Sequence, residues 1–217
     1  MAKEDNEGTL TTEVVQKTIE LGRLLLQFGL TLRATHHEDQ ETRETDTTHT
    51  VMLGIMACAY AEMYAPNLDR GKIAQYALAH DLVEVYAGDT PTLGITDDEL
   101  MKKKNEREAA ALTRIKSEYD SAYPWIARTI EEYETLASPE ARYVKVFDKV
   151  LPKIVHIINK GVTVRSLGHA GDSVKEFHAY QVHKLRTTYG ADQEEAMELL
   201  RCVNAAVEVA RHEWSAE

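Results

Sequence analysis

The sequence of 217 residues has little of what marks several protein classes. Its two cysteines, Cys58 and Cys202, are too few for a disulfide framework and indicate a reducing compartment or indifference to redox conditions. Cys58 lies in an apolar run, which predicts a buried free thiol. No apolar stretch approaches the roughly 20 residues that cross a bilayer. Residues 1–12 are polar and acidic, unlike a signal peptide. We therefore expect a cytoplasmic protein.

Basic residues are also scarce. The chain has 25 lysines and arginines against 36 acidic residues, a net charge of −11. Proteins that grip long nucleic acids usually carry a basic surface, because neutralising phosphates supplies most of the affinity. The charge therefore disfavours long nucleic acids and anionic membranes as partners. A small anionic substrate stays compatible with it, since a few cations and a metal ion can dominate one pocket.

Helical signals dominate the chain, and 43% hydrophobic residues suffice for a core. We predict one all-α domain over 1–217 with seven or eight helices, a core of about 15–165 and C-terminal helices over 171–213. Helices are expected over 12–29, 49–65, 69–86, 97–120, from Pro124, over 138–160, and after Gly171 and Gly190. Residues 31–48 have no apolar period, so we expect a long polar loop there, and long loops are often functional.

The strongest local signal is the segment AHDLVEVYAGDTP, residues 79–91. If it is helical, Glu84 follows His80 by four residues and Asp81 by three, so all three share one side. Two adjacent ligands and a carboxylate one turn later suit a metal ion and an acid–base group. On its own, however, a His–Asp pair is usually a hydrogen-bonded pair or a helix cap.

Asp148 strengthens the case for a metal. Apolar residues lie four before it and three and seven after it, so its carboxylate faces the core. An unpaired buried charge costs several kcal/mol, and Asp148 therefore needs an arginine, several donors or a metal ion. Pro152 lacks the N–H that would bond the Asp148 carbonyl, which predicts a helix kink. His49 alone would be a cap or a core residue, but joined to His80, Asp81 and Asp148 it completes a set that leaves open positions on one divalent ion.

The order His49, His80–Asp81, Asp148 resembles the HD-domain metal-dependent phosphohydrolases. The pattern HD-x-x-E-x-x-x-G-D-x-P, residues 80–91, is similar to the branch that contains the 5′-deoxynucleotidases. Further matches to that branch are Arg33 upstream of the first histidine, Glu44 five residues before it, and Lys145 three residues before the last aspartate. The resemblance covers about residues 15–165.

The resemblance implies a helical fold and hydrolysis of a phosphate ester on a nucleotide, foremost a (deoxy)nucleoside 5′-monophosphate to nucleoside and phosphate. It implies one divalent ion (Co, Mn, Zn, Fe or Mg) held by His49, His80, Asp81 and Asp148. Glu84 and Asp89 would be the catalytic groups near the phosphate and the attacking water, and Arg33 and Lys145 would bind phosphate. A guanidinium matches phosphate geometry in a bidentate way.

Two alternatives stay open. The first is a dNTP triphosphohydrolase that releases triphosphate, for which additional basic residues should line the pocket; Arg165 and Lys184 are the candidates. The second is a non-catalytic nucleotide-binding regulatory module, disfavoured because the ligands, Glu84 and Asp89 are all intact.

Ala34 stands where the branch often has tryptophan, which leaves sugar and base preference open. The partner is a small nucleotide, a homo-oligomer is an open option, and His169, His178 and His183 are expected on the surface.

Overall fold

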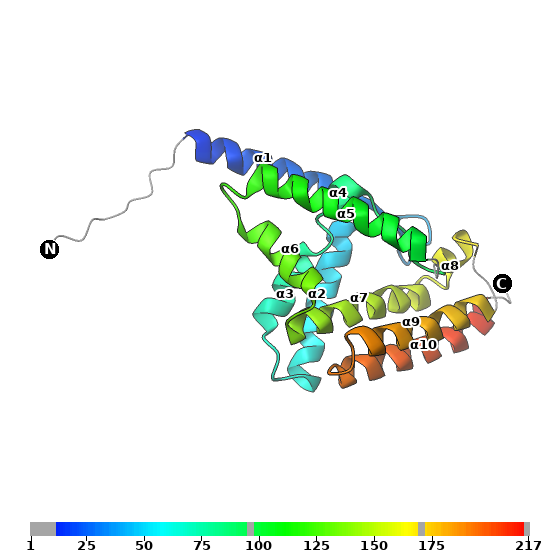
Figure 1. Cartoon of the computed structure of the whole chain (residues 1–217). Coiled ribbons are helices and arrows are strands. Elements are labelled where there is room, and N and C mark those ends of the chain that lie inside the picture. Colours follow the sequence, from blue (N-terminus) through cyan, green and yellow to red (C-terminus); the bar gives the residue numbers. More distant parts are fainter. Residues whose placement is uncertain (1–11, 95–97, 169–171, 215–217) are drawn as a thin grey trace.

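The computed structural model describes residues 12–94, 98–168 and 172–214 (Figure 1). Its elements are α1 (Thr12–Phe28), β1 (Leu32–His36), β2 (Arg43–Thr45), α2 (Asp46–Tyr64), α3 (Arg70–Ala79), α4 (Glu84–Ala87), α5 (Asp98–Tyr119), α6 (Trp125–Thr135), α7 (Pro139–Ile158), α8 (Val162–Ser166), α9 (Asp172–Thr188) and α10 (Glu194–Trp214). Eight of these described helices have ten residues or more. The predicted all-α class is confirmed.

The helix α7 lies at the centre of the fold, in contact with α2, α3, α6 and α10. Its buried residues lie on most sides of the helix, and among them Val144, Phe147, Leu151 and Val155 recur every three or four positions. Along α2 the buried residues Leu53, Ala57 and Ala61 do the same. In Figure 1, α9 and α10 lie side by side along α7, and α10 contacts both of them. The residues of α7 that face this core therefore fix where Asp148 points.

The prediction of a loop over residues 31–48 is wrong. Residues 32–36 and 43–45 form an antiparallel hairpin in which Leu32 pairs with Thr45 and His36 with Arg43. These strands are too short to show an alternating pattern in the sequence. Contacts from distant residues hold β1 in place: Asn159 Nδ2 donates to the His36 carbonyl at 2.7 Å, and the His36 N–H donates to Thr163 Oγ1 at 2.9 Å. The hairpin therefore depends on tertiary contacts.

The helix expected over 69–86 is broken at the His–Asp pair. The helix α3 ends at Ala79, and α4 begins at Glu84. Between them the Glu84 N–H donates to the Asp81 carbonyl at 2.9 Å, a bond over three residues that tightens the turn. Gly88 follows α4 with φ of +73°, a backbone conformation that favours glycine, and the chain turns there toward Asp89. His80 and Asp81 thus lie in a turn between two helices.

Pro152, Cys58 and the lack of a membrane-spanning segment were further expectations from the sequence. The helix α7 continues through Pro152 to Ile158. Cys58 is only partly buried, and its thiol donates to the Arg70 carbonyl at 3.5 Å; both cysteines are free. In the described part of the chain, every helix is too short or too polar to cross a membrane.

Candidate metal centre and active site

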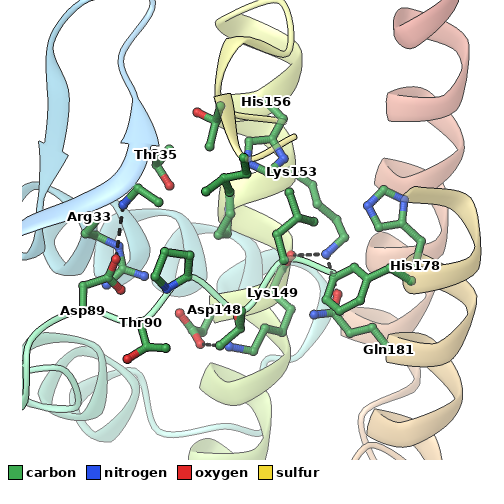
Figure 2. A pocket seen from close by; sticks show the side chains of 18 residues that line it. Arg33, Thr35, Asp89, Thr90, Asp148, Lys149, Lys153, His156, His178 and Gln181 are labelled. Atoms are coloured by element: carbon green, nitrogen blue, oxygen red, sulfur yellow. Dashed lines mark hydrogen bonds and ion pairs between the residues drawn. The ribbon is translucent and has the colours of Figure 1, made fainter. Parts of the chain in front are cut away.

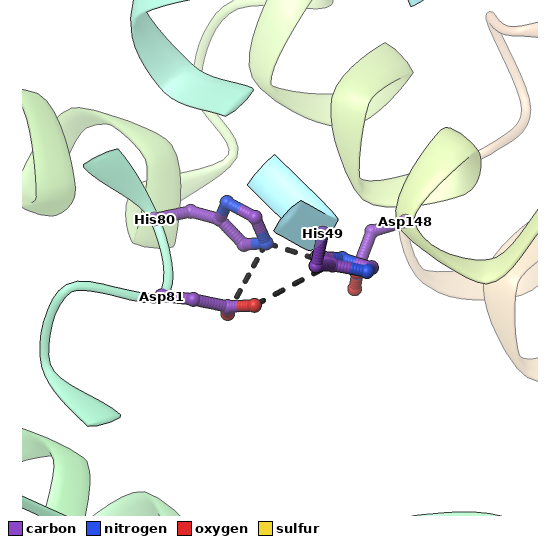
Figure 3. A group of neighbouring side chains, drawn as sticks. All are labelled: His49, His80, Asp81 and Asp148. Carbon is purple, nitrogen blue, oxygen red and sulfur yellow. Dashed lines mark hydrogen bonds and ion pairs between the residues drawn. The ribbon is translucent and has the colours of Figure 1, made fainter. Parts of the chain in front are cut away.

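Four side chains from three parts of the fold meet at one point (Figure 3). His49 comes from α2, His80 and Asp81 from the turn between α3 and α4, and Asp148 from α7. His49 Nε2 lies 3.0 Å from Asp148 Oδ1, and His80 Nε2 lies 3.1 Å from Asp81 Oδ1. One ligand atom from each residue can be chosen so that all lie within 4.8 Å of one another. Ligands at about 2.1 Å on opposite sides of an ion would be about 4.2 Å apart, so the cluster needs only slight contraction.

The imidazole of His80 is oriented as a metal ligand should be. Its Nδ1–H donates to the Ala77 carbonyl at 2.9 Å, so Nε2 carries the lone pair of the neutral ring. That Nε2 is buried without a hydrogen-bond partner and faces carboxylate oxygens of Asp81 and Asp148. A lone pair among carboxylates requires a cation or a proton. The donor set of two nitrogens and two oxygens therefore fits a divalent ion, and several first-row metals suit it.

Glu44 lies behind His49, on the side away from the other ligands. Glu44 Oε2 is 3.8 Å from His49 Nδ1, and the Glu44 side chain is only 2% exposed. Neither carboxylate oxygen of Glu44 has a hydrogen bond, and the nearest cationic atom is Arg33 Nε at 3.7 Å. A carboxylate behind a metal-ligating histidine fixes the ring and raises its basicity. At 3.8 Å and without a hydrogen bond, Glu44 can act on the ring of His49 through its negative charge.

The charges of the ligands are strongly coupled. Burial would lower the pKa of His80, but the carboxylates of Asp81 and Asp148 outweigh it and raise the pKa to about 9. Burial would raise the pKa of Asp148, yet Lys149 and the two histidines hold it well below its usual range. The aspartates are therefore ionised and ready to bind a cation, whereas His80 must release a proton to do so.

A second group of carboxylates surrounds Arg33. Oxygens of Asp46, Asp81 and Glu84 lie within 4.8 Å of one another, which would also suit a cation. Arg33 Nη1 lies among them, 3.1 Å from Asp46 Oδ1, 2.7 Å from Asp81 Oδ2 and 3.5 Å from Glu84 Oε2. The guanidinium therefore supplies the positive charge of this cluster. Its side chain is 13% exposed and lines both of the chambers described below.

Glu84 and Asp89 lie beside the ligand cluster with perturbed acidities. Burial and the negative charge of Asp81 raise the pKa of Glu84 well above its ordinary value. Burial also raises the pKa of Asp89, whose Oδ2 accepts the Ala34 N–H at 3.2 Å. A carboxyl group whose pKa is raised this far, as in Glu84, holds its proton near neutral pH and is suited to general acid–base work.

A chamber of about 520 Å³ opens on one side of the cluster, here called the larger chamber. Glu84, Asp89 and Lys145 line it. Lys145 Nζ lies 4.7 Å above the ring of Tyr133 and 3.4 Å from Glu134 Oε1. The wall is otherwise rich in aromatic and aliphatic side chains from α5, α6, α9 and the residue after α9: Met101, Leu112, Ile130, Phe177, Tyr180 and Tyr189. Such a wall suits a flat organic group.

A smaller chamber of about 90 Å³ opens on the other side of Asp148, between β1, the loop 89–93, α7 and α9 (Figure 2). Lys149, Lys153 and His156 reach it from α7, and His178 reaches it from α9. The expectation that His178 is a surface residue is wrong, because it is 4% exposed. His183 is exposed as expected, and His169 lies outside the described residues.

The cations expected from the sequence are partly different from those found. Lys184 lines the larger chamber, whereas Arg165 is absent from both chambers and donates to the Lys160 carbonyl at 2.7 Å. Sequence reasoning missed Lys149 and Lys153, although both lie on the helix of Asp148, one and five residues after it. It also missed Asp46. This residue precedes His49 by three positions and Leu53 by seven, so the helical spacing could have placed it on the same buried face.

Comparisons with known proteins show the family of the chain. The family model of the HD domain matches residues 27–204, most of the chain. This chain belongs to the HD domain family. The match includes all four residues of the ligand cluster.

Individual relatives are more distant. The chain is 30% identical over 108 residues to 5′-deoxynucleotidase HDDC2 of Danio rerio; the match covers 49% of this chain and spans about half of the zebrafish protein, 51%. A solved structure of a predicted metal-dependent phosphohydrolase from Magnetospirillum magnetotacticum superposes with a TM-score of 0.70 at 22% identity, covering 90% of this chain and 93% of that one. A conserved hypothetical protein from Pyrococcus furiosus superposes with a TM-score of 0.54 at 22% identity, covering 82% and 98%. These two structures support the fold.

Proposed function

We propose that this protein is a metal-dependent phosphohydrolase that cleaves the phosphate ester of a nucleoside 5′-phosphate, with deoxynucleoside 5′-monophosphates as the simplest substrates. The observation that carries the proposal is the cluster His49, His80, Asp81 and Asp148, three of whose members line a chamber with an apolar, aromatic wall. A divalent ion held there would polarise a phosphoryl oxygen and acidify a water molecule. The partial match to a 5′-deoxynucleotidase favours a nucleotide as the ester.

The residues around the cluster then bind the phosphate, transfer the proton and orient the reacting groups. Arg33 and Lys145 hold the phosphate from two sides, since both line the larger chamber beside the ligands. Glu84, with its raised pKa, moves the proton between water and leaving oxygen. Asp89, fixed by the Ala34 N–H, orients the water or the phosphate. A general acid–base group of this kind contributes about 10²- to 10⁴-fold to the rate.

The larger chamber is the natural place for the nucleoside. Its volume of about 520 Å³ lies in the range of small-molecule sites. A base can stack on aromatic rings such as those of Tyr180 and Tyr189, which are partly exposed.

The second candidate is cleavage of a dNTP with release of triphosphate. The observation that favours it is the smaller chamber, where Lys149 and Lys153 supply cations that a monophosphate would not use.

Product analysis separates the two reactions. Metal-loaded protein is incubated with dAMP and with dATP, and with the corresponding ribonucleotides, and nucleoside, phosphate and triphosphate are separated. The proposal expects deoxyadenosine and phosphate from dAMP, and a Glu84→Gln variant that produces neither. Triphosphate from dATP with dAMP untouched would replace the first candidate by the second. No metal-dependent release from any nucleotide would overturn both.

A further inference from the structure

The smaller chamber adjoins the larger one beside Asp148 of the ligand cluster. Arg33, Asp89, Asp148 and Lys149 line both chambers, so a group bound at the ligands can extend into either. One wall of the smaller chamber extends along α7 from Asp148 and is formed by the side chains at positions 149, 152, 153 and 156. Eight residues of helix span about 12 Å, which sets the depth of the wall along α7.

The cation of Lys153 is not balanced by a carboxylate. The residue is 4% exposed. Its Nζ donates to the Lys149 carbonyl at 3.0 Å and to Gln181 Oε1, and both oxygens are uncharged. Burial and the charge of Lys149 lower the pKa of Lys153 to about 7. A buried cation without a counter-ion is costly, and an anion in the chamber would offset that cost.

Two histidines beside Lys153 have unused polar atoms. His156 and His178 are 5% and 4% exposed, and their rings face Lys153 in Figure 2. His156 Nδ1 and both ring nitrogens of His178 lack a hydrogen-bond partner; His178 Nδ1 lies 3.7 Å from Glu208 Oε1. Burial and Lys153 lower the pKa values of both rings to about 3, so each is neutral and has one N–H to donate.

The acidic residues of the chamber are already compensated. Asp148 Oδ2 accepts from Lys149 Nζ at 2.6 Å, and its other oxygen faces His49 Nε2 at 3.0 Å. Asp89 accepts the Ala34 N–H and lies at the boundary with the larger chamber. With a divalent ion at the ligands, the charge facing the chamber is positive.

Building on the proposed nucleotide hydrolysis, we infer that the smaller chamber, lined by Lys149, Lys153, His156 and His178, binds a second phosphate group joined to the one at the metal ligands. The nucleotides held best are then di- and triphosphates. The nucleoside occupies the larger chamber, its first phosphate lies at the cluster, and the next phosphates extend along α7. This is a site for oxyanions, which accept from an ammonium and from imidazole N–H groups.

Calorimetric titration tests the subsite apart from turnover. The metal-loaded Glu84→Gln protein, which binds nucleotides without consuming them, is titrated with dAMP, dADP and dATP. We expect Kd to fall at least tenfold from dAMP to dATP. Adding Lys153→Met should remove most of this gain, while the matched variant Lys175→Met, at an exposed position of α9, should keep it.

Each outcome has a separate meaning. Equal Kd values for the three nucleotides, or a gain that survives Lys153→Met, overturn the subsite even if the wild-type protein hydrolyses nucleotides. A gain lost with Lys153→Met supports the subsite even if the wild-type protein hydrolyses none of them, in which case only the proposed reaction fails. Urea unfolding of the Lys153→Met protein confirms that the variant is folded, because methionine fills a similar volume without a buried charge.

Discussion

Replacing Glu44 by glutamine should weaken metal binding without changing any ligand. Glu44 Oε2 lies 3.8 Å from His49 Nδ1, and the side chain is buried. Glu44→Gln keeps the shape of the side chain and removes the charge that faces the ring. When His49 Nε2 binds a cation, positive charge shifts onto the ring, and the carboxylate stabilises it.

The distance sets the size of the effect. A full positive charge 3.8 Å from the carboxylate would gain about 4 kcal/mol at an effective dielectric constant of about 20. A ligating imidazole carries only part of a unit charge, so a contribution of about 1.4 kcal/mol is expected, which is about tenfold in affinity. Metal dissociation constants for Mn²⁺ or Co²⁺, measured by competition with a coloured chelator, give this ratio directly.

Glu41→Gln is the matched control, since Glu41 is exposed in the loop between β1 and β2, three residues before Glu44. It removes the same charge far from the ring and should leave the affinity within about twofold, as expected for screened surface charges. Equal metal affinities for Glu44→Gln and Glu41→Gln would refute the role given to Glu44.

Three other perturbations have defined outcomes. Glu84→Gln should keep the metal and lower kcat by about 10²-fold or more, and elemental analysis that shows the metal gone would make Glu84 a ligand instead. Arg33→Gln should raise KM and also destabilise the fold by about 3–5 kcal/mol, because Asp46 and Asp81 lose a buried partner; an unchanged urea midpoint would contradict this. Burial lowers the pKa of Lys153 to about 7 from 10.5, so between these pH values the unfolded chain binds a proton that the folded chain lacks, and stability rises with pH. Lys153→Met should therefore stabilise the protein most below pH 7, with a gain that shrinks by at most about 1.4 kcal/mol per pH unit above it, whereas a pH-independent gain would contradict the burial of a charged amine.

The long helices could be predicted because apolar residues recur at helical spacing and because caps mark their ends. Ser138, which caps α7 by accepting the Ala141 N–H, is such a signal. The helix α2 begins three residues before its predicted start, because its cap is Thr45. The hairpin could not be predicted, since β1 is held by Asn159 and Thr163, more than 120 residues away. Pairing of that kind leaves no periodic trace in the strand itself.

The candidate site divides in the same way. His80, Asp81 and Glu84 form a local motif that can be recognised in the sequence. His49 and Asp148 lie far from this motif in the sequence, and the order of the four residues in the family pattern pointed to them. The predicted regular helix through the motif is wrong, because a tight turn separates α3 from α4. The smaller chamber was missed because His178 reaches it only through the packing of α9 near α7.

The central claim is that His49, His80, Asp81 and Asp148 hold the ion on which hydrolysis depends. The most direct test measures bound metal and phosphate release from nucleotides in the same samples of chelator-treated, reloaded and Asp148→Ala protein. We expect no hydrolysis after chelation, recovery with Mn²⁺ or Co²⁺, and loss of both metal and activity in Asp148→Ala, with folding checked by circular dichroism. Full metal occupancy and full activity in Asp148→Ala would contradict the four-ligand centre.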